Sequence, residues 1–547
     1  MPKKITINQR VGEFEIGTSL FEAGERLDIS VPSSCRKQGK CRECLMEITT
    51  GMGSLSAPSP EEAHLKDNFR LSCCARITEV PGEIQAHTMR RAEIHIEDQA
   101  MNLPPEAALE KIDPAVTREG DRVLMDGQEI AIYRGPLVGL AIDIGTTTVV
   151  IRALDLESGD IIASTSLENP QRFGGTDVMS RIQFDSDHPG KLLHRTLLGY
   201  LTRAIKQLPV APDSIFEIVV AGNPTMRDLF LGMDVSSIGQ RPYRSLSEKA
   251  WRDGVADTTA VSIPARKLRL PCHPEARLYA MPVVSGHVGG DAAACLLAVA
   301  GDRTDELIAI MDIGTNTEVF MGQKDRLLAA SCPAGPAFEG RAISQGMPGL
   351  AGAIEKVHIA DNGETEITVI GNKAPEGICG SGLISLLAEL KRTEVMNAFG
   401  RFEDGEPAFV VDEAHDISFL ESDVNELAQA KGANVSGLRI VAQTYGQSLG
   451  DLDKFYLAGG FGRHLDIAAA KEIGLIPDLP DEKIVQIGNA AIEGACLALL
   501  SVSRRRDLEE RVKTIEHVEL ETDPNFFDHF VEGCQFQPFG VETEEDQ

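Results

Sequence analysis

The sequence predicts a multidomain protein in which a small α+β domain precedes a larger α/β domain made of two similar lobes. Three observations predict this fold class. The chain has 547 residues, more than a single hydrophobic core usually holds. Residues 1–92 alternate short apolar segments with turns around a cluster of cysteines. From residue 137 onward, an apolar strand that runs into Asp-Ile-Gly-Thr occurs twice, which indicates an internal duplication.

The domain boundaries follow changes in the sequence pattern. Within residues 1–92, apolar segments at 5–7 and 13–16 predict a hairpin, and several further short elements follow, as in a compact α+β domain. Residues 93–136 contain an Asn-Leu-Pro-Pro run, which is typical of a linker, so we expect a linker or a reduced middle domain there. Residues 137–547 are expected to form the two-lobed α/β domain.

The charge of the chain argues against one class of partner. The formal net charge is −30. Residues 1–92 contain 13 Lys and Arg against 12 Asp and Glu, so the acidic excess lies in the rest of the chain. Nucleic-acid binding needs cations that neutralise phosphates, and we therefore expect no nucleic-acid partner. The excess serves either solubility or the docking of a partner protein.

The sequence also predicts a cytoplasmic location. No run of about 18 apolar residues is present, so we expect no membrane span. The opening Met-Pro-Lys-Lys leads into a strand-like segment and lacks the apolar core of a signal peptide. The cysteines number 11, an odd total, and six are scattered without a regular spacing, which favours reduced thiols over a disulfide framework.

Four cysteines in the first domain have the spacing of a metal-cluster site. Cys35, Cys41 and Cys44 read C-x5-C-x2-C, and Cys73 follows after 28 residues. Three thiolates on one loop and a distant fourth are typical of a [2Fe–2S] site. Zinc is an alternative, although it prefers two paired C-x2-C knuckles, and inert thiols are another. Spacing alone leaves Cys73 and Cys74 open as the fourth ligand.

This segment resembles the bacterial and adrenodoxin-like ferredoxins, whose first gap is also five residues. The resemblance implies a β-grasp-like ferredoxin fold that holds a [2Fe–2S] cluster. Arg70-Leu71-Ser72-Cys73 matches the Arg-Leu-small-Cys pattern of those ferredoxins, which implies that Cys73 is the fourth ligand and Cys74 a buried neighbour.

The two Asp-Ile-Gly-Thr segments predict phosphate loops. Each follows an apolar strand, and the glycine allows a tight turn that brings backbone N–H groups and hydroxyls close to phosphate oxygens. The carboxylates Asp143 and Asp312 are expected to reach Mg²⁺, mainly through water, and to be the catalytic residues. The residues expected to bind ATP in the loops are Gly145, Thr146, Thr147, Thr148, Gly314, Thr315, Asn316 and Thr317.

Two further glycine-rich segments complete the expected nucleotide site. We expect one to lie against the adenosine and the other to line the site; their residues are Gly459, Gly460 and Gly462, and Gly380, Ser381 and Gly382. A reading of these glycines as simple turns stays open. No G-x-G-x-x-G opens a helix after the first strand, so a Rossmann domain is not expected.

Together these loops resemble the acetate kinase, sugar kinase, Hsp70 and actin superfamily, which implies an actin-like ATPase domain with a duplicated core. With the ferredoxin-like segment in front, the domain order resembles the reductive activators of corrinoid proteins. That resemblance implies an ATP-hydrolysing iron–sulfur reductase that returns Co(II) to Co(I) by one electron for methyl transfer. It also implies a corrinoid protein of a methyltransferase system as partner, a low-potential electron donor, and a homodimer.

Three other functions remain alternatives at this stage. The first alternative is an ATP-driven electron donor to a non-corrinoid enzyme. The second is a small-molecule kinase with a redox-sensing cluster, and the third is an Hsp70-like binding module. The corrinoid protein, the methyl donor, the electron donor, the dimer interface and the residue that orients the attacking water are not specified by the sequence.

Overall fold

The computed structural model describes residues 2–8, 10–29, 31, 35, 37–39, 44–65, 68–89, 102–459 and 465–540. The chain divides into two compact units, and each is described by itself. The first unit comprises Met1–Ile94, Pro114–Asp253 and Val261–Ala280. The second comprises His95–Asp113, Gly254–Ala260 and Met281–Gln547.

The N-terminal part of the first unit is a mixed sheet with one helix, as the sequence predicted. The hairpin is confirmed, since β1 (Lys3–Ile7) pairs antiparallel with β2 (Arg10–Phe14). The sheet order is β2-β1-β5-β3-β4, and β1 runs parallel to β5. The other strands and the α-helix among the described residues are α1 (Leu20–Arg26), β3 (Leu45–Thr50), β4 (Phe69–Leu71) and β5 (Ile84–Thr88).

The segment that follows has more structure than a plain linker. Within 93–136, the described residues form a three-stranded antiparallel sheet of β6 (Val116–Glu119), β7 (Arg122–Met125) and β8 (Gln128–Ile132). Gly120 and Gly127, both with positive φ, stand in the two tight turns that join these strands. Arg118 also lies 4.3 Å from the ring centre of Tyr133.

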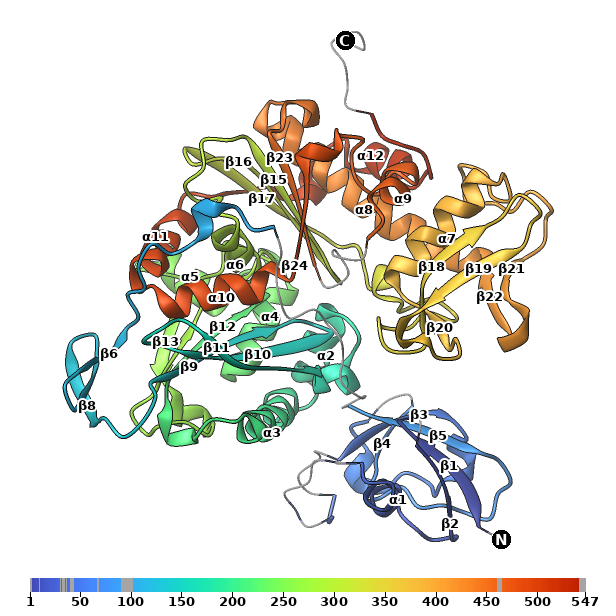
Figure 1. Ribbon diagram of the computed structural model, residues 1–547, viewed down its shortest axis with the longest axis horizontal. Coiled ribbons are helices and arrows are strands. Elements are labelled where there is room, and N and C mark those ends of the chain that lie inside the picture. The colour runs from blue at the N-terminus through green and yellow to red at the C-terminus, as the bar shows by residue number, and fades with distance from the viewer. Residues whose placement is uncertain are drawn as a thin grey trace. The chain divides into compact units, whose positions relative to one another are not determined.

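The first unit also contains a six-stranded α/β sheet, ordered β11-β10-β9-β12-β14-β13 (Figure 1). Strands β9 to β11 form an antiparallel meander, whereas β12 and β14 continue the sheet in parallel on the other side of β9. Every residue of β9 and β12 is buried, as expected of central strands. The bounds are β9 (Val138–Ile144), β10 (Thr148–Asp155), β11 (Ile161–Glu168), β12 (Ile215–Gly222), β13 (Val261–Pro264), β14 (Arg277–Ala280), α2 (Val178–Asp187), α3 (Leu192–Gln207), α4 (Pro224–Leu231) and α5 (Leu246–Arg252).

The second unit repeats this topology. Its six-stranded sheet has the order β24-β23-β15-β16-β17-β25. Again three strands form an antiparallel meander, and two more run parallel to the first strand on its other side. The predicted duplication of the core is therefore confirmed. The bounds are β15 (Ile308–Ile313), β16 (Thr317–Gln323), β17 (Arg326–Cys332), β23 (Lys454–Ala458), β24 (Ile484–Gly488) and β25 (Glu516–His517).

The second unit carries an insertion between β17 and β23. A small sheet β19-β18-β20 packs against α7, and a hairpin β21–β22 leads into the long helix α8 (Figure 1). The bounds are β18 (Ala353–Ile359), β19 (Thr365–Val369), β20 (Gly377–Ile378), β21 (Ala408–Asp412), β22 (Ile417–Leu420), α7 (Gly380–Arg392) and α8 (Glu421–Tyr445). Two further helices, α9 (Ile467–Glu472) and α12 (Phe526–Gly533), follow β23 in the chain.

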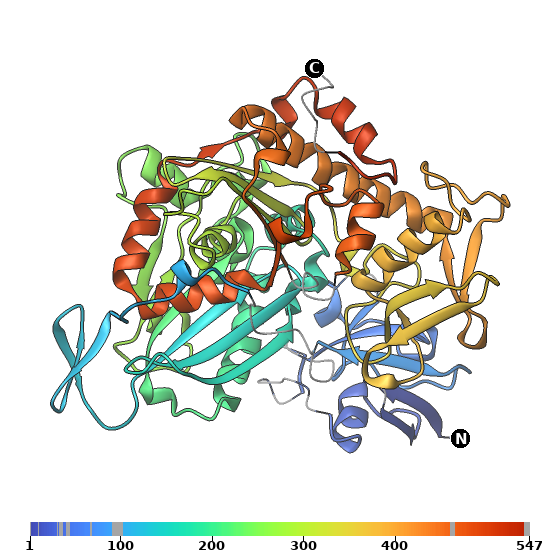
Figure 2. The ribbon, with the colours of Figure 1, turned by 45° about the horizontal axis from the view of Figure 1, so that its top comes forward.

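Two helices of the second unit cross at backbone contact. Helix α6 (Gly290–Ala298) packs against α10 (Ala490–Leu500). A Cβ atom added to Gly494 would lie 1.9 Å from the carbonyl oxygen of Ala294, so only glycine fits there. Helix α11 (Val502–Val512) follows, and Figure 2 shows the two orange-red helices α10 and α11 meeting at an angle. Ser501 lies at this joint and caps α11 by accepting from the N–H of Arg504.

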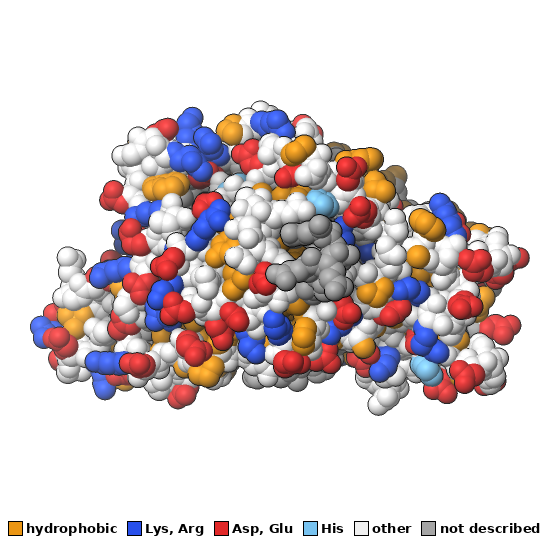
Figure 3. Space-filling view, turned by 90° about the horizontal axis from the view of Figure 1, so that it is seen from above, with side chains coloured by type: hydrophobic (Ala, Val, Ile, Leu, Met, Phe, Trp, Pro, Cys, Tyr) orange, Lys and Arg blue, Asp and Glu red, His pale blue; other side chains and the backbone are white. Residues whose placement is uncertain are grey.

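Within the part of the chain that the structure describes, no helix has the length and apolar character needed to cross a lipid bilayer. The face drawn in Figure 3 has acidic and basic side chains interspersed, with hydrophobic side chains in small groups.

A buried lysine ties the C-terminal region to α8. Lys431 is 1% exposed, and its Nζ donates to the carbonyl oxygens of Gln535 at 2.7 Å, Gly474 at 3.4 Å and Gly533. Burial lowers the pKa of this ammonium to about 7. One side chain thus supplies a donor to three backbone acceptors of two different segments.

Replacement of Lys431 by Met is expected to destabilise this region, because three buried carbonyl groups lose their common donor. The expected loss is at least about 2 kcal/mol, since a buried unsatisfied polar group costs about 1–3 kcal/mol. Native-state hydrogen exchange at α8 and α12 measures it as the free energy of local opening. The matched control is Lys454→Met, because the Lys454 Nζ donates to one carbonyl, that of Glu482, at 2.9 Å. Equal opening energies in both variants would contradict the role given to Lys431.

Candidate functional site

Two of the four predicted cluster cysteines lie side by side in the structure. Cys44 directly precedes β3 and Cys73 lies two residues after β4. These strands pair antiparallel with Leu45 opposite Leu71, so the pairing brings together residues far apart in sequence. The two Sγ atoms are 3.3 Å apart, and both side chains are buried. Cys35 accepts a hydrogen bond from the N–H of Gln38 at 3.3 Å, and Cys41 lies outside the described residues.

The chemistry of this pair suits an iron–sulfur cluster. The hydrogen bond with Cys73 lowers the pKa of Cys44 to about 7, and the same contact together with burial raises the pKa of Cys73. The hydrogen bond thus stabilises the thiolate form of Cys44, and the thiolate is the form that binds metal. Cys74 stands next to the pair, its Sγ 3.8 Å from that of Cys73.

An ion pair that the sequence analysis missed holds the segment before Cys73. Arg70 donates from Nε to Glu62 at 2.8 Å, and both side chains are almost completely buried. Glu62 also accepts from the backbone N–H of Leu71 at 2.9 Å. Glu62 thus fixes the end of β4 and, with it, the position of Cys73. The Arg-Leu-Ser-Cys run contained one half of this pair, but nothing in the sequence indicated its acidic partner.

The first phosphate loop is a tight turn between β9 and β10. Asp143 is 8% exposed and lies at the end of β9. The N–H of Gly145 donates to the carbonyl oxygen of Thr148, the first residue of β10, at 2.9 Å. Thr146 is buried, and Thr147 lies between the two strands.

Three buried side chains from elsewhere in the first unit hold this loop. Asn169 Nδ2 donates to the carbonyl oxygen of Gly145 at 2.8 Å, Arg181 Nη2 to that of Thr146 at 2.7 Å, and Asn223 Nδ2 to the Thr146 hydroxyl at 3.2 Å. The sequence analysis missed Asn169 and Arg181 as loop contacts. Asn223 lies in a Gly-Asn-Pro-Thr segment directly after β12, a position that could have indicated it.

These contacts give the loop the polarity of an anion site. In a trans peptide group the carbonyl and the N–H point in opposite directions. Because Asn169 and Arg181 hold the carbonyls of Gly145 and Thr146, the N–H groups of Thr146 and Thr147 point away from those two donors. Successive N–H groups arranged in this way form a concave surface for phosphate oxygens, so the residues present fit a nucleotide.

The second phosphate loop lies between β15 and β16 and is richer in acids. Asp312, at the end of β15, accepts from the Cys295 thiol at 3.1 Å and stands opposite Glu318 in the strand register. Thr315 donates to Glu339 Oε1 at 3.0 Å. Asn316 follows in the loop, and Thr317 is the first residue of β16.

Burial raises the pKa of Asp312, and burial together with the charges of Asp291 and Asp312 raises that of Glu318 well above its ordinary value. Such a group of acids suits a nearby cation. Among the described residues, no set of three or more His, Cys, Asp or Glu side chains is arranged to hold a metal ion. Mg²⁺ bound beside a nucleotide usually keeps several waters and takes further ligands from phosphates and one or two carboxylates. The sequence analysis missed Glu318, Asp291 and Glu339.

A glycine stands at the end of β12 and directly after β23, the corresponding strands of the two lobes. Gly459, with φ of 115°, lies so close to β15 that a Cβ atom would stand 2.3 Å from the carbonyl oxygen of Ile313. Gly222 in the first unit has φ of 159°, and its Cβ would stand 3.0 Å from the carbonyl oxygen of Ile144. Gly459 is therefore required by the approach of the backbone to the phosphate loop. Gly460 and Gly462 lie outside the described residues.

The predicted Gly-Ser-Gly segment opens helix α7. A Cβ on Gly382 would lie 2.2 Å from the carbonyl oxygen of Ile354, so packing against β18 accounts for this glycine. Ser381 is buried, with its Oγ 3.3 Å from the Sγ of Cys379, and Gly380 is the first residue of the helix. A role of these three residues in binding ATP stays a prediction.

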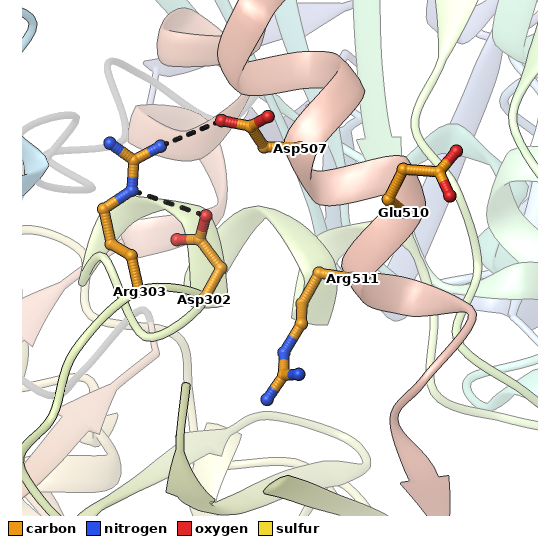
Figure 4. Close-up of a pocket in the computed structure, with 5 residues that line it drawn as sticks. All are labelled: Asp302, Arg303, Asp507, Glu510 and Arg511. Carbon is orange, nitrogen blue, oxygen red and sulfur yellow. Dashed lines mark hydrogen bonds and ion pairs between the residues drawn. The ribbon is translucent and has the colours of Figure 1, made fainter. Parts of the chain in front are cut away.

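A pocket of about 580 Å³ lies elsewhere in the second unit, where the end of α6 faces α11 (Figure 4). Arg303 pairs with Asp507 at 3.2 Å and with Asp302 at 3.7 Å. Glu510 and Arg511 complete the lining. Acidic and basic groups offset one another there, and the pocket contains none of the predicted site residues.

Comparison with protein-family models divides the chain into three matched segments. Residues 5–78 match the 2Fe-2S iron-sulfur cluster binding domain. Residues 138–303 match the model described as the RACo middle region, and residues 306–545 match the C-terminal domain of RACo, the ASKHA domain. The sequence analysis had looked for a middle domain within residues 93–136, whereas the model with that description matches the first α/β lobe.

Individual relatives agree with these matches. The chain is 32% identical over 431 residues to the corrinoid activation enzyme RamQ of Eubacterium limosum, covering 73% of this chain and 70% of that protein. It is 25% identical over 416 residues to the [Co(II) methylated amine-specific corrinoid protein] reductase of Methanosarcina barkeri, covering 71% and 75%. A solved structure of a reductive activator for corrinoid, iron-sulfur protein covers 98% of both chains with a TM-score of 0.71 and 28% identity.

The ferredoxin-type cysteine site, the duplicated phosphate-loop topology and the similarity to these relatives lead to one conclusion. The chain belongs to the family of corrinoid-protein reductive activators, with an N-terminal ferredoxin domain and a C-terminal actin-like ATPase domain.

Proposed function

We propose that this protein reactivates a corrinoid protein by an ATP-dependent transfer of one electron that converts Co(II) to Co(I). The observation that carries the proposal is the presence in one chain of the Cys44–Cys73 sulfur pair and the two Asp-Ile-Gly-Thr loops. The names of the relatives, one a corrinoid activation enzyme and one a reductase of a Co(II) corrinoid protein, support the same acceptor.

The ligand set of the ferredoxin domain is Cys35, Cys41, Cys44 and Cys73. A [2Fe–2S] cluster bound by these residues supplies a carrier for one electron. The buried pair of Arg70 and Glu62 keeps Cys73 next to Cys44.

The ATPase residues act by binding and orientation. The N–H groups of the first loop would donate to phosphate oxygens, and Asp143 and Asp312 would hold Mg²⁺. ATP hydrolysis makes an uphill electron transfer feasible only if the ATP-bound and ADP-bound forms of the protein differ in one of two ways. They must differ in their affinity for the corrinoid protein or in the environment that they provide for its corrinoid. Catalysis of this type consists mainly of positioning and electrostatic stabilisation.

The partners follow from this function. The acceptor is the corrinoid protein of a methyltransferase system, and a low-potential reductant supplies the electron. The acidic excess of the ATPase part suits the docking of a partner with a complementary charge. A homodimer and a cytoplasmic location belong to the same proposal; the reducing cytoplasm suits thiols that must stay available for a cluster.

The function is tested by an anaerobic optical assay. Reduced protein is mixed with Co(II) corrinoid proteins from several methyltransferase systems, with and without Mg-ATP. We expect the Co(I) absorption band to appear with at least one of them, and only when Mg-ATP is present. Active cluster and ATPase without any Co(I) signal across the panel would oppose a corrinoid acceptor.

Replacement of Asp312 by Ala separates the two halves of the reaction. The variant should keep the visible absorbance of its cluster but lose ATP hydrolysis and corrinoid reduction by about 10²–10³-fold, the usual effect of removing one key electrostatic group. Asp361→Ala, at an exposed position of the same unit, is the control and should keep both activities. Coupled reduction at the normal rate in Asp312→Ala would refute the assigned role.

The neighbouring cysteines Cys73 and Cys74 test the fourth cluster ligand. Cys73→Ser should lose or strongly alter the visible absorbance and the electron paramagnetic resonance signal, because its sulfur adjoins Cys44. Cys74→Ser should leave both spectra unchanged. The reverse pattern would transfer the ligand role to Cys74.

A further inference from the structure

One short helix of the first α/β lobe contacts both the ferredoxin domain and the first phosphate loop. This 3₁₀ helix, η4 (Pro170–Gly174), directly follows Asn169 at the end of β11. All of these residues belong to the first compact unit.

The contact with the ferredoxin domain is centred on Arg172. Its guanidinium donates from Nη1 and Nη2 to the two carboxylate oxygens of Glu47, at 3.3 and 3.4 Å, and also pairs with Glu168. Burial alone would lower the pKa of Arg172, but the two carboxylates raise it. A guanidinium on two oxygens of one carboxylate fixes orientation as well as distance.

Aromatic contacts complete this surface. The Arg172 guanidinium lies 5.8 Å from the ring centre of Phe69 in the ferredoxin domain. Phe173 meets His64 edge to face at 5.9 Å and, on the lobe side, Phe184 of α2 at 5.4 Å. His64, Phe69 and Phe173 are all buried. The ferredoxin domain therefore packs on η4 through both charged and apolar contacts.

The contact with the phosphate loop is made three residues before Arg172. The side chain of Asn169 donates to the carbonyl oxygen of Gly145 at 2.8 Å, and its backbone N–H donates to that of Thr147 at 2.7 Å. Asn169 is completely buried, and its Oδ1 accepts from the N–H of Gln171 inside η4. The residue that holds the loop is thus also the cap of the helix that holds the ferredoxin domain.

We propose that nucleotide binding at the first phosphate loop and docking of the ferredoxin domain on η4 favour one another. Docking fixes η4 through Arg172 and Phe173. The fixed helix keeps Asn169 on the loop carbonyls, which is the arrangement that suits phosphate. Linkage then requires that bound nucleotide strengthen docking by the same factor. This inference rests on the proposed function only for the statement that the loop binds nucleotide.

The test measures binding of Mg-AMPPNP to the full-length protein with its cluster in place. Glu47→Lys places a second cation next to Arg172 and leaves the residues of the phosphate loop unchanged. We expect the Kd of this variant for Mg-AMPPNP to be at least about fivefold higher than that of the wild type, the lower end of ordinary allosteric coupling. Glu13→Lys, on the exposed side of β2, makes the same charge change in the same domain and should stay within about twofold of wild type. Glu47→Gln, which keeps the side-chain shape, replaces Glu47→Lys if that variant loses its cluster.

Hydrogen exchange of the wild-type protein supplies a second measurement that needs no variant. Mg-AMPPNP should increase the protection of peptides that cover His64 and Phe69, compared with the nucleotide-free protein. Equal Kd values in wild type and the Glu47 variants, or unchanged protection of those peptides, would overturn the coupling alone. Wild-type protein that binds no Mg-AMPPNP would overturn the nucleotide site and the coupling together.

Discussion

The ATPase part of this protein depends on a backbone approach that occurs once in each lobe. The strand that carries Asp143 or Asp312 near its end runs parallel to a second strand, and a glycine at the end of that second strand, Gly222 or Gly459, lies against the carbonyl of the residue after the aspartate. A side chain at either glycine would push the two strands apart. The loop, the aspartate and the segment after the second strand would then no longer share one edge of the sheet, where ligands of open α/β sheets bind.

The cysteine site rests on a comparable use of strand pairing. Cys44 and Cys73 are far apart in sequence, yet the register of β3 and β4 sets their sulfurs 3.3 Å apart. The buried pair of Glu62 and Arg70 secures the end of β4. In both the ferredoxin domain and the ATPase part, the pairing of regular strands brings the site residues together. A few buried polar side chains then hold the irregular segments that follow the strands.

Sequence reasoning could name candidate site residues where they form a pattern that is local in the chain. The cysteine spacing, Asp143, Asp312 and the glycine after β23 are local patterns, and the repeated Asp-Ile-Gly-Thr predicted the duplicated topology. Asn169, Arg181 and Glu339 were missed because each reaches its loop through the fold, whereas Glu318 directly follows the second loop and is placed beside Asp312 by the strand register. An isolated arginine in a helical segment is normally predicted to lie on the surface. Arg181 is instead completely buried and donates to the carbonyl oxygen of Thr146 in the first phosphate loop. The amount of regular structure in residues 93–136 was also underestimated, because the three short strands within 116–132 contain few apolar residues in a regular pattern.

The crossing of α6 and α10 has a consequence for how the second unit deforms. At Gly494 the two helices touch through main-chain atoms, so their separation is set by van der Waals contact of the backbones and cannot be adjusted by a change of rotamer. Pulling them apart would open a void with no side chain to fill it. Separation of α6 from α10 at this point would therefore lose a main-chain contact that no side chain can replace.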